Sequence, residues 1–161
     1  METPLHFHKL CSNDVEQLGG LLEANNRPEV INFFYPFPMS RETAQKILSP
    51  FKKDSFFVAV LDNEFIGLSM LRGFDEGFNI PSFGIFIDFF HQGNGYGRKL
   101  TEWTLNWSDE HQIENVRLAV YATNMVALKL YLSLGFVKSE EYKDKFGRLR
   151  FIMHRYLKQY I

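Results

Sequence analysis

The residues with the clearest chemical potential are three glycines in the stretch "HQGNGYGRK", namely Gly93, Gly95 and Gly97. They follow an apolar run, residues 80–90, and precede a segment whose apolar residues recur at helical spacing. At a strand-to-helix junction, successive backbone N–H groups converge and the helix dipole adds positive potential. Glycine lets phosphate oxygens approach because it has no Cβ. The stretch therefore predicts either a pyrophosphate cradle or a tight turn that binds nothing.

Two common phosphate loops do not fit this stretch. A Walker loop has the pattern G-x-x-x-x-G-K-S/T, but the residue five places after Gly93 is Arg98. A Rossmann fingerprint, G-x-G-x-x-G, would need its third glycine at Arg98 or at Leu100. The pattern that remains is Q-x-x-G-x-G, formed by Gln92, Gly95 and Gly97.

A second group of polar residues lies in "YATNMVALKLYLSLGF". Asn124 follows an apolar strand-like run, and Tyr131 comes seven residues later. That spacing is about two helical turns, so both residues would lie on one helix face. Taken alone, Asn124 indicates an ordinary helix N-cap and Tyr131 an inward-facing aromatic side chain.

Together the two motifs resemble the signatures of the GNAT superfamily of acetyl-coenzyme A-dependent N-acetyltransferases. The first signature, Q/R-x-x-G-x-G/A, matches residues 92–97. The second, N-x-x-A-x-x-x-Y-x-x-x-G-F, matches Asn124, Ala127, Tyr131, Gly135 and Phe136. The resemblance covers about residues 83–136, and the hairpin "FVAVLDNEFIGLSML" is similar to the superfamily's second and third strands. The segment 26–48 has a fainter resemblance to the branch that acetylates ribosomal-protein N-termini.

The elements that must position these motifs follow from the hydrophobic pattern. It predicts the order β-α-α-β-β-β-α-β-α-β-β, an α/β class with a mixed sheet covered by helices, in a single domain, residues 1–161. Asn13 and Ser40 are expected to cap the first two helices, and Asp62-Asn63 to turn a hairpin. The resemblance implies a twisted, mostly antiparallel sheet of about seven strands. Two of these strands would splay into a V around acetyl-CoA.

The resemblance also implies roles for individual residues. The loop amides would hold the pyrophosphate of acetyl-CoA, and the strand before the loop would pair with the pantetheine arm. The donor site would then comprise Ile85, Phe86, Ile87, Gln92, Gly93, Asn94, Gly95, Tyr96, Gly97, Arg98, Asn124, Ala127 and Tyr131. Tyr131 would protonate the departing thiolate.

The acceptor side departs from some relatives. Histone-acetylating members carry a Glu base at a position that here falls on Pro81, which cannot serve. The nearest acids are Asp75 and Glu76, and Ser82 could hold a relay water. An amine of low pKa would need no base. The acceptor cleft would be walled by Phe33, Phe34, Tyr35 and Phe37, which could equally be core or dimer-contact residues.

The function that these expectations favour is transfer of an acetyl group to a primary amine by direct attack in a ternary complex. The acceptor would be a protein N-terminus or a small amine such as a nucleotide-linked amino sugar. Two alternatives stay open at this point. One is a non-catalytic acyl-CoA-binding module, and the other is a nucleotide-binding protein without acyl transfer.

Composition excludes several other classes. The formal net charge is −1, so nothing in bulk attracts nucleic acid or an anionic membrane. No apolar run approaches the roughly 18 residues of a transmembrane helix, and the first residues lack a signal peptide's apolar run. A single cysteine and the pair His6 and His8 offer no credible metal site. We therefore expect a cytoplasmic monomer or homodimer without a metal.

Overall fold

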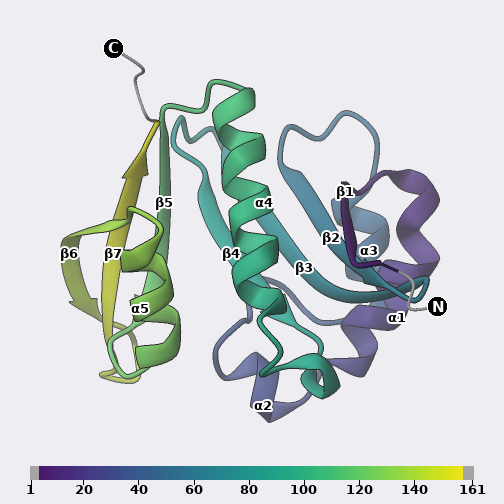
Figure 1. Ribbon diagram of the computed structural model, residues 1–161, viewed down its shortest axis with the longest axis horizontal. Helices are drawn as coiled ribbons and strands as arrows, with labels where there is room; N and C mark the ends of the chain where they lie inside the picture. The colour runs from purple at the N-terminus through teal and green to yellow at the C-terminus, as the bar shows by residue number, and fades with distance from the viewer. Residues whose placement is uncertain (1–3, 158–161) are drawn as a thin grey trace.

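The computed structural model describes residues 4–157, and within them one seven-stranded sheet has the order β1-β2-β3-β4-β5-β7-β6 (Figure 1). Neighbouring strands are antiparallel except β4 and β5, which are parallel. The mixed, mostly antiparallel sheet expected from the resemblance is therefore confirmed. The strands are β1 His6–Lys9, β2 Ser55–Leu61, β3 Glu64–Arg72, β4 Ser82–Ile87, β5 Asn115–Tyr121, β6 Val137–Lys143 and β7 Leu149–Tyr156.

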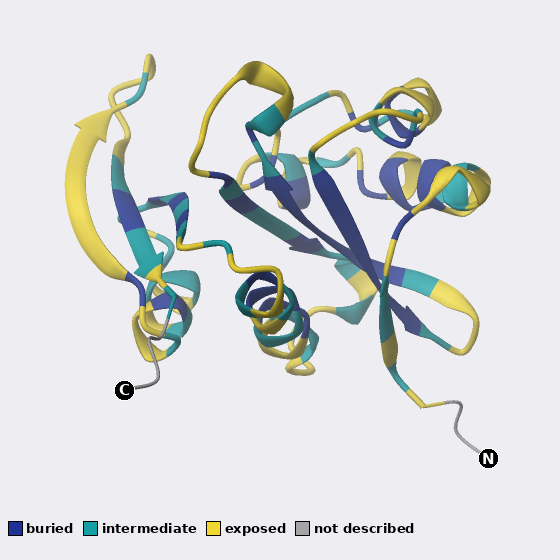
Figure 2. Cartoon of the chain, turned by 90° about the horizontal axis from the view of Figure 1, so that it is seen from above, coloured by how far each residue is buried: buried dark blue, intermediate teal, exposed yellow. Residues whose placement is uncertain are grey.

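Helices cover both faces of the sheet (Figures 1 and 2). One face packs against α1 Val15–Ala24, α2 Pro28–Ile31 and α3 Arg41–Ile47, through a core that includes Leu18 and Leu68. The other face packs against α4 Tyr96–Glu110 and α5 Met125–Ser133. Buried and partly exposed residues alternate along β5 because of this arrangement, since Val116, Leu118 and Val120 are buried in the core beneath α5. The residues between them face the opposite side of the sheet.

Two predicted helix caps are present. The Ser40 hydroxyl accepts a hydrogen bond from the backbone N–H of Thr43 at 3.2 Å. The Asn124 side-chain oxygen likewise accepts from the backbone N–H of Ala127 at 3.3 Å. Each bond satisfies an amide that the first helical turn leaves without a partner.

The start of the first helix was predicted wrongly. Asn13 lies within a short 3-10 turn, Ser12–Asp14, and α1 begins only at Val15. The turn is closed by the Asp14 carboxylate, which accepts from the Cys11 amide at 2.9 Å. The hydrophobic pattern also missed α2, whose first residue is Pro28, because four residues carry too little periodicity to detect.

The parallel pair β4 and β5 is joined at one point. Only Ser82 and Arg117 are in register, beside a hydrogen bond from the Arg117 amide to the Pro81 carbonyl at 3.0 Å. Beyond that point the two strands diverge (Figure 1), and residues 83–87 of β4 pair with β3 alone. The expected V-shaped splay is therefore present, and it leaves one backbone edge of β4 open.

Within residues 4–157 no helix has the length and apolar character that crossing a membrane requires. In the same residues no three His, Cys, Asp or Glu side chains lie close enough together to hold a metal ion.

Candidate functional site

The glycine loop leads from β4 into α4 and leaves open space in front of its backbone. Gly93 and Gly95 both have φ of +81°, a left-handed conformation that side chains with a Cβ adopt at a cost. A Cβ added at either glycine would meet no atom of residues 4–157 within 4 Å. The room that these glycines keep is therefore not filled by the protein itself.

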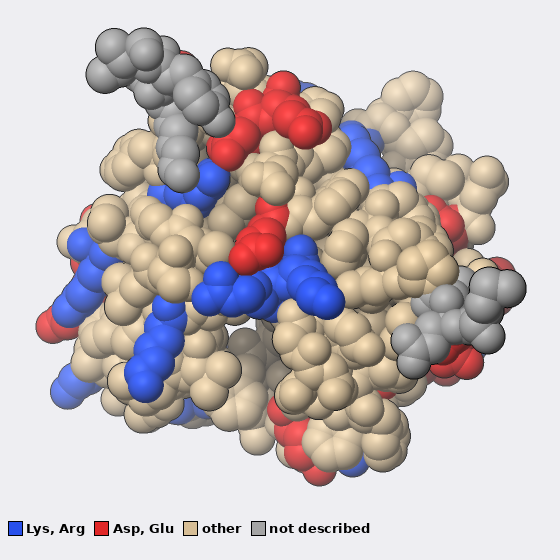
Figure 3. All heavy atoms as spheres, viewed as in Figure 1, with Lys and Arg blue, Asp and Glu red and all other residues tan. Residues whose placement is uncertain are grey.

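The amides of this loop are available to a ligand. The first amide of α4 that donates a hydrogen bond to a backbone carbonyl is that of Lys99, which lies 3.3 Å from the Gly95 carbonyl oxygen. Within the described part of the chain, the amides of residues 93–98 have no acceptor. They stand at the positive end of a 15-residue helix. Basic side chains gather over the N-terminal half of α4, beside a hollow between α4 and α5 (Figure 3). This set of donors suits a phosphate or pyrophosphate.

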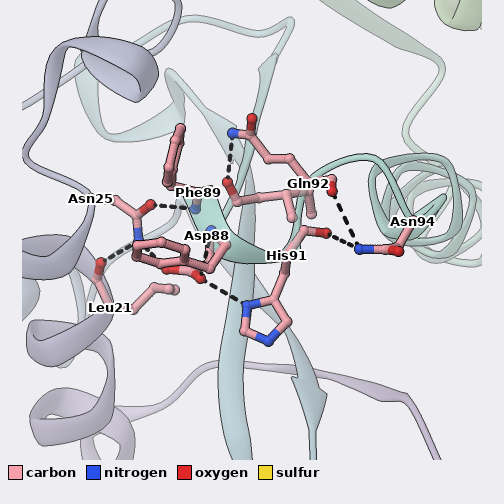
Figure 4. A network of polar contacts seen from close by, with 9 residues as sticks. Leu21, Asn25, Asp88, Phe89, His91, Gln92 and Asn94 are labelled. Carbon is pink, nitrogen blue, oxygen red and sulfur yellow. Dashed lines mark hydrogen bonds and ion pairs between the residues drawn. The ribbon is translucent and has the colours of Figure 1, made fainter.

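A buried amide anchors the start of the loop (Figure 4). Asn25, at the C-terminal end of α1, is fully buried and donates to the Leu21 carbonyl at 2.9 Å and to Asp88 Oδ1 at 2.8 Å. Its own oxygen accepts from the Phe89 amide at 2.9 Å, and the other Asp88 oxygen lies 2.8 Å from Nδ1 of His91. Asp88 therefore orients the loop from β4, and α1 holds Asp88 in place.

The polar side chains of the loop are used within the loop. Gln92 Nε2 donates to the Ile87 carbonyl at 3.1 Å, and Asn94 Nδ2 donates to the His91 carbonyl at 3.1 Å (Figure 4). These bonds occupy carbonyl groups and leave the amides unpaired. Arg98 donates to the Ser133 hydroxyl at 2.8 Å, which ties the first turn of α4 to the end of α5.

Tyr131 lies where α5 meets the splayed part of β4. Its side chain is 8% exposed, and its ring packs edge-on against Phe83 of β4 and Phe136, with centroids 6.1 and 5.7 Å away. Burial raises the pKa of the Tyr131 phenol to about 12. Among the described residues nothing forms a hydrogen bond with its hydroxyl. The group stays protonated near neutral pH and is free to donate to a ligand.

A cavity of about 750 Å³ lies across the sheet from α5, at the closed end of the splay. Ser82 and Arg117 face it because they alternate with Phe83 and Val116, which belong to the core beneath α5. Its lining residues are Arg72, Gly73, Glu76, Phe78, Asn79, Ile80, Ser82, Arg117 and His154. The sequence motifs pointed to Glu76 and Ser82 but missed the two arginines and the histidine.

The two candidate acids differ in their surroundings. Glu76 lines the cavity, with a carboxylate oxygen 3.6 Å from Arg72. Asp75 instead accepts from the backbone amides of Lys53 and Asp54, at 2.8 and 3.0 Å. These two hydrogen bonds lower the pKa of Asp75 below its ordinary value. A carboxylate held in this way is a weaker proton acceptor, so the geometry favours Glu76.

The aromatic segment before α3 does not form one wall. Phe34 is buried and packs on Phe86 at 4.9 Å and on Phe37 at 6.0 Å, inside the core between α1 and the sheet. Phe33 and Tyr35 are 59% and 60% exposed. Gly84 of β4 makes room for the neighbouring Met70, because an added Cβ there would collide with the Met70 side chain but would only touch the Phe34 ring, at 3.5 Å.

Comparison with known proteins shows which family this chain belongs to. A sequence profile of the Acetyltransferase (GNAT) family matches residues 22–136. N-acetylaspartate synthetases of Homo sapiens and Rattus norvegicus are each 32% identical over 81 residues, which is 50% of this chain and 27% of those proteins. The match thus spans about a quarter of the length of these relatives.

Solved structures share the fold at low sequence identity. Ribosomal-protein-S5-alanine acetyltransferase from Vibrio fischeri has a TM-score of 0.80 and 18% identity, covering 100% of this chain and 99% of that chain. Spermidine N-acetyltransferase from Vibrio cholerae, in complex with CoA and spermine, has a TM-score of 0.78 and 22% identity, covering 95% of each. The profile match, the signature residues and this fold agree, and the chain belongs to the Acetyltransferase (GNAT) family.

Proposed function

We propose that this protein transfers the acetyl group of acetyl-CoA to a primary amine by direct attack in a ternary complex. The observation that carries the proposal is the arrangement along β4. The strand begins at Ser82, in the cavity, and ends at Ile87, before the glycine loop, roughly 16 Å away at about 3.3 Å per residue. Between these ends its edge toward β5 is unpaired. A donor bound from the loop and an acceptor bound from the cavity would meet along this edge.

The donor side fits acetyl-CoA. The unpaired amides of residues 93–98 would hold the pyrophosphate, with Gly93 and Gly95 giving the close approach. The open edge at Ile85–Ile87 would pair with the pantetheine arm, and Asn124 and Ala127 would border it from α5. Acetyl-CoA supplies the acetyl group as an activated thioester. A backbone N–H near Ile87 would hydrogen-bond its carbonyl and stabilise the developing oxyanion.

Two side chains would move protons. The Tyr131 hydroxyl would donate to the sulfur as the thioester bond breaks, and its pKa of about 12 keeps it protonated until then. Glu76, or Asp75 in its place, would take a proton from the acceptor amine through a water held by Ser82. Holding both reactants in one site would supply much of the rate by removing the cost of bringing them together.

We propose the acceptor as a class, a primary amine, and not as a single compound. The names of similar proteins refer to ribosomal-protein alanine, spermidine and N-acetylaspartate, which supports an amine acceptor. We retain a protein N-terminus and a small amine as the two candidates. A non-catalytic acyl-CoA-binding module is the alternative, and the free, protonated hydroxyl of Tyr131 argues against it.

The test is thiol release from acetyl-CoA across a panel of amines. The panel contains N-terminal peptides, lysine peptides, amino acids, aminoglycosides, polyamines and nucleotide-linked amino sugars. We expect sustained release with one class, and a loss of that release in the Tyr131→Phe variant. Tight binding of acetyl-CoA with no release for any amine would instead support the binding module.

A further inference from the structure

The cavity at the closed end of the splay contains a row of side chains that reaches across four strands. Arg72 of β3 is in register with Ser82 of β4, Ser82 with Arg117 of β5, and Arg117 with His154 of β7. Residues in register on neighbouring strands project from the same face, and neighbouring strands lie about 4.8 Å apart. All four residues line the cavity. We call this set the arginine row.

Arg117 is the member whose charge the protein leaves uncompensated. It is partly buried, and one guanidinium nitrogen donates to the neutral Ser82 hydroxyl at 3.1 Å. In the stretch from residue 4 to residue 157 it forms no ion pair. Arg155, on the other face of β7, shows the contrast, because its two terminal nitrogens bond both oxygens of Asp109 at 2.9 and 2.8 Å. A guanidinium fork without a carboxylate, inside a cavity, is suited to an anionic ligand.

Arg72 adds a second positive charge that is only loosely compensated. It donates to the Pro36 carbonyl at 3.3 Å, and its guanidinium lies 5.3 Å from the centre of the Phe37 ring. Its contact with Glu76 is 3.6 Å, longer than a hydrogen bond, and the Glu76 side chain is 59% exposed. Such an exposed pair is weak and screened by water. Arg72 is therefore held in position while its charge stays available to the cavity.

The charges that line the cavity are two arginines against one glutamate, before any contribution from His154. An acceptor with several positive charges would be repelled here. The cavity is within the size range of sites for small ligands. Ser82 and Ile87 are five residues apart, roughly 16 Å along β4. An acceptor with its amine beside the thioester carbonyl near Ile87 would thus extend its other end along β4 toward the arginine row.

We propose that the arginine row binds a carboxylate of the acceptor, so that the acceptor is a small amine that also carries a carboxylate. This inference rests on the proposed acetyl transfer and names the substrate class of the same site. Arg117 provides the fork, Arg72 the second charge, and Ser82 holds the Arg117 side chain in place. Polyamines are disfavoured by the same charges.

The experiment compares amino acids with their own carboxamides as acceptors in thiol release. Each pair differs in the carboxylate alone, and the carboxamide has the less basic amine, so amine reactivity favours the carboxamide. We expect kcat/KM to be at least about tenfold higher for the amino acid, the scale of one hydrogen bond to a charged group. Spermidine and phosphoethanolamine complete the panel. Equal use of both pair members, or a preference for spermidine or phosphoethanolamine, would overturn the carboxylate assignment.

Two variants test whether the preference for the amino acid depends on the arginine row. Arg117→Gln should raise KM for the amino acid at least about tenfold, leave KM for acetyl-CoA unchanged, and remove the preference for the amino acid over its carboxamide. Arg155→Gln is the matched control on the opposite face, and should lower stability without altering the preference. If Arg117→Gln keeps the preference, the row does not bind the carboxylate.

A binding measurement separates this inference from the proposed function. Calorimetric titration of the wild-type protein, with CoA present, compares an N-acetylated amino acid with its carboxamide. Preference for the carboxylate, lost in Arg117→Gln, would support the row even if no amine released thiol. Thiol release without such a preference would support acetyl transfer and refute the row.

Discussion

Substitution of Gly95 by alanine tests whether the glycine loop is a phosphate cradle. Gly95 has φ of +81°, and a left-handed conformation costs an alanine about 1–2 kcal/mol. In a chain of this size each 1 kcal/mol lowers Tm by about 2–4 °C, so the variant should melt about 2–8 °C lower. The added methyl group would meet no protein atom within 4 Å, so no further loss of stability is expected.

The effect on acetyl-CoA should be much larger. A methyl group in front of the loop would keep phosphate oxygens away from the amides and break one or two hydrogen bonds. A hydrogen bond to a charged group contributes about 1.5–3 kcal/mol, so the binding free energy should weaken by about 1.5–6 kcal/mol. That corresponds to a Kd raised about 10-fold to 20,000-fold. Isothermal titration of acetyl-CoA would measure it.

Gly147→Ala is the matched control. Gly147 has φ of +78° in the turn between β6 and β7, and an added Cβ there also meets nothing within 4 Å. It should lose similar stability and bind acetyl-CoA as the wild type does. If Gly95→Ala binds acetyl-CoA within about threefold of Gly147→Ala, the loop amides do not hold the pyrophosphate and the reasoning fails.

Other predictions concern single side chains. Tyr131→Phe should keep the Kd for acetyl-CoA and lower kcat at least about tenfold in thiol-release assays, and an unchanged kcat would remove the hydroxyl from the mechanism. Burial raises the pKa of Tyr131 from 10.0 to about 12, so the stability that its protonated form contributes is complete below pH 10 and lost as pH rises through 12. Urea unfolding at pH 8 and 11 should therefore show a steeper loss for the wild type than for Tyr131→Phe. Asn25→Ala leaves Oδ1 of Asp88 and the Phe89 amide without their hydrogen bonds to Asn25 and should cost about 2–3 kcal/mol in urea unfolding, together with weaker acetyl-CoA binding. Normal affinity in a destabilised Asn25→Ala would mean that the anchor serves stability alone.

The glycine loop and α5, which we propose as the donor half of the site, could be located from sequence because their determinants are local. Gln92, Gly95 and Gly97 lie within six consecutive residues, and few residues other than glycine tolerate the left-handed φ of Gly95. Asn124 and Tyr131 are related by helical spacing, and in the structure Asn124 caps α5 while Tyr131 lies within it. The order of helices and strands followed in the same way, except where α2 and the 3-10 turn are too short to leave a periodic pattern.

The acceptor half could not be predicted in this way. Within the aromatic segment Phe34 is buried in the core and Phe33 is exposed. This difference depends on which side of the chain meets the sheet. The separation of Asp75 from Glu76 depends on the amides of Lys53 and Asp54, which lie more than twenty residues earlier. Adjacent acids therefore have different surroundings, and no local pattern distinguishes them.

By itself, the sequence determined the family signatures, the glycine loop and the helix that presents Tyr131, because each depends on spacing along the chain. Only the tertiary structure brought Asn25 to Asp88, 63 residues apart, and aligned Arg72, Ser82, Arg117 and His154 on one face. The physical reason is that strand register and the packing of helices on a sheet join residues that are remote in sequence. That Arg117 has no ion-pair partner among the described residues becomes visible only once its neighbours in space are known.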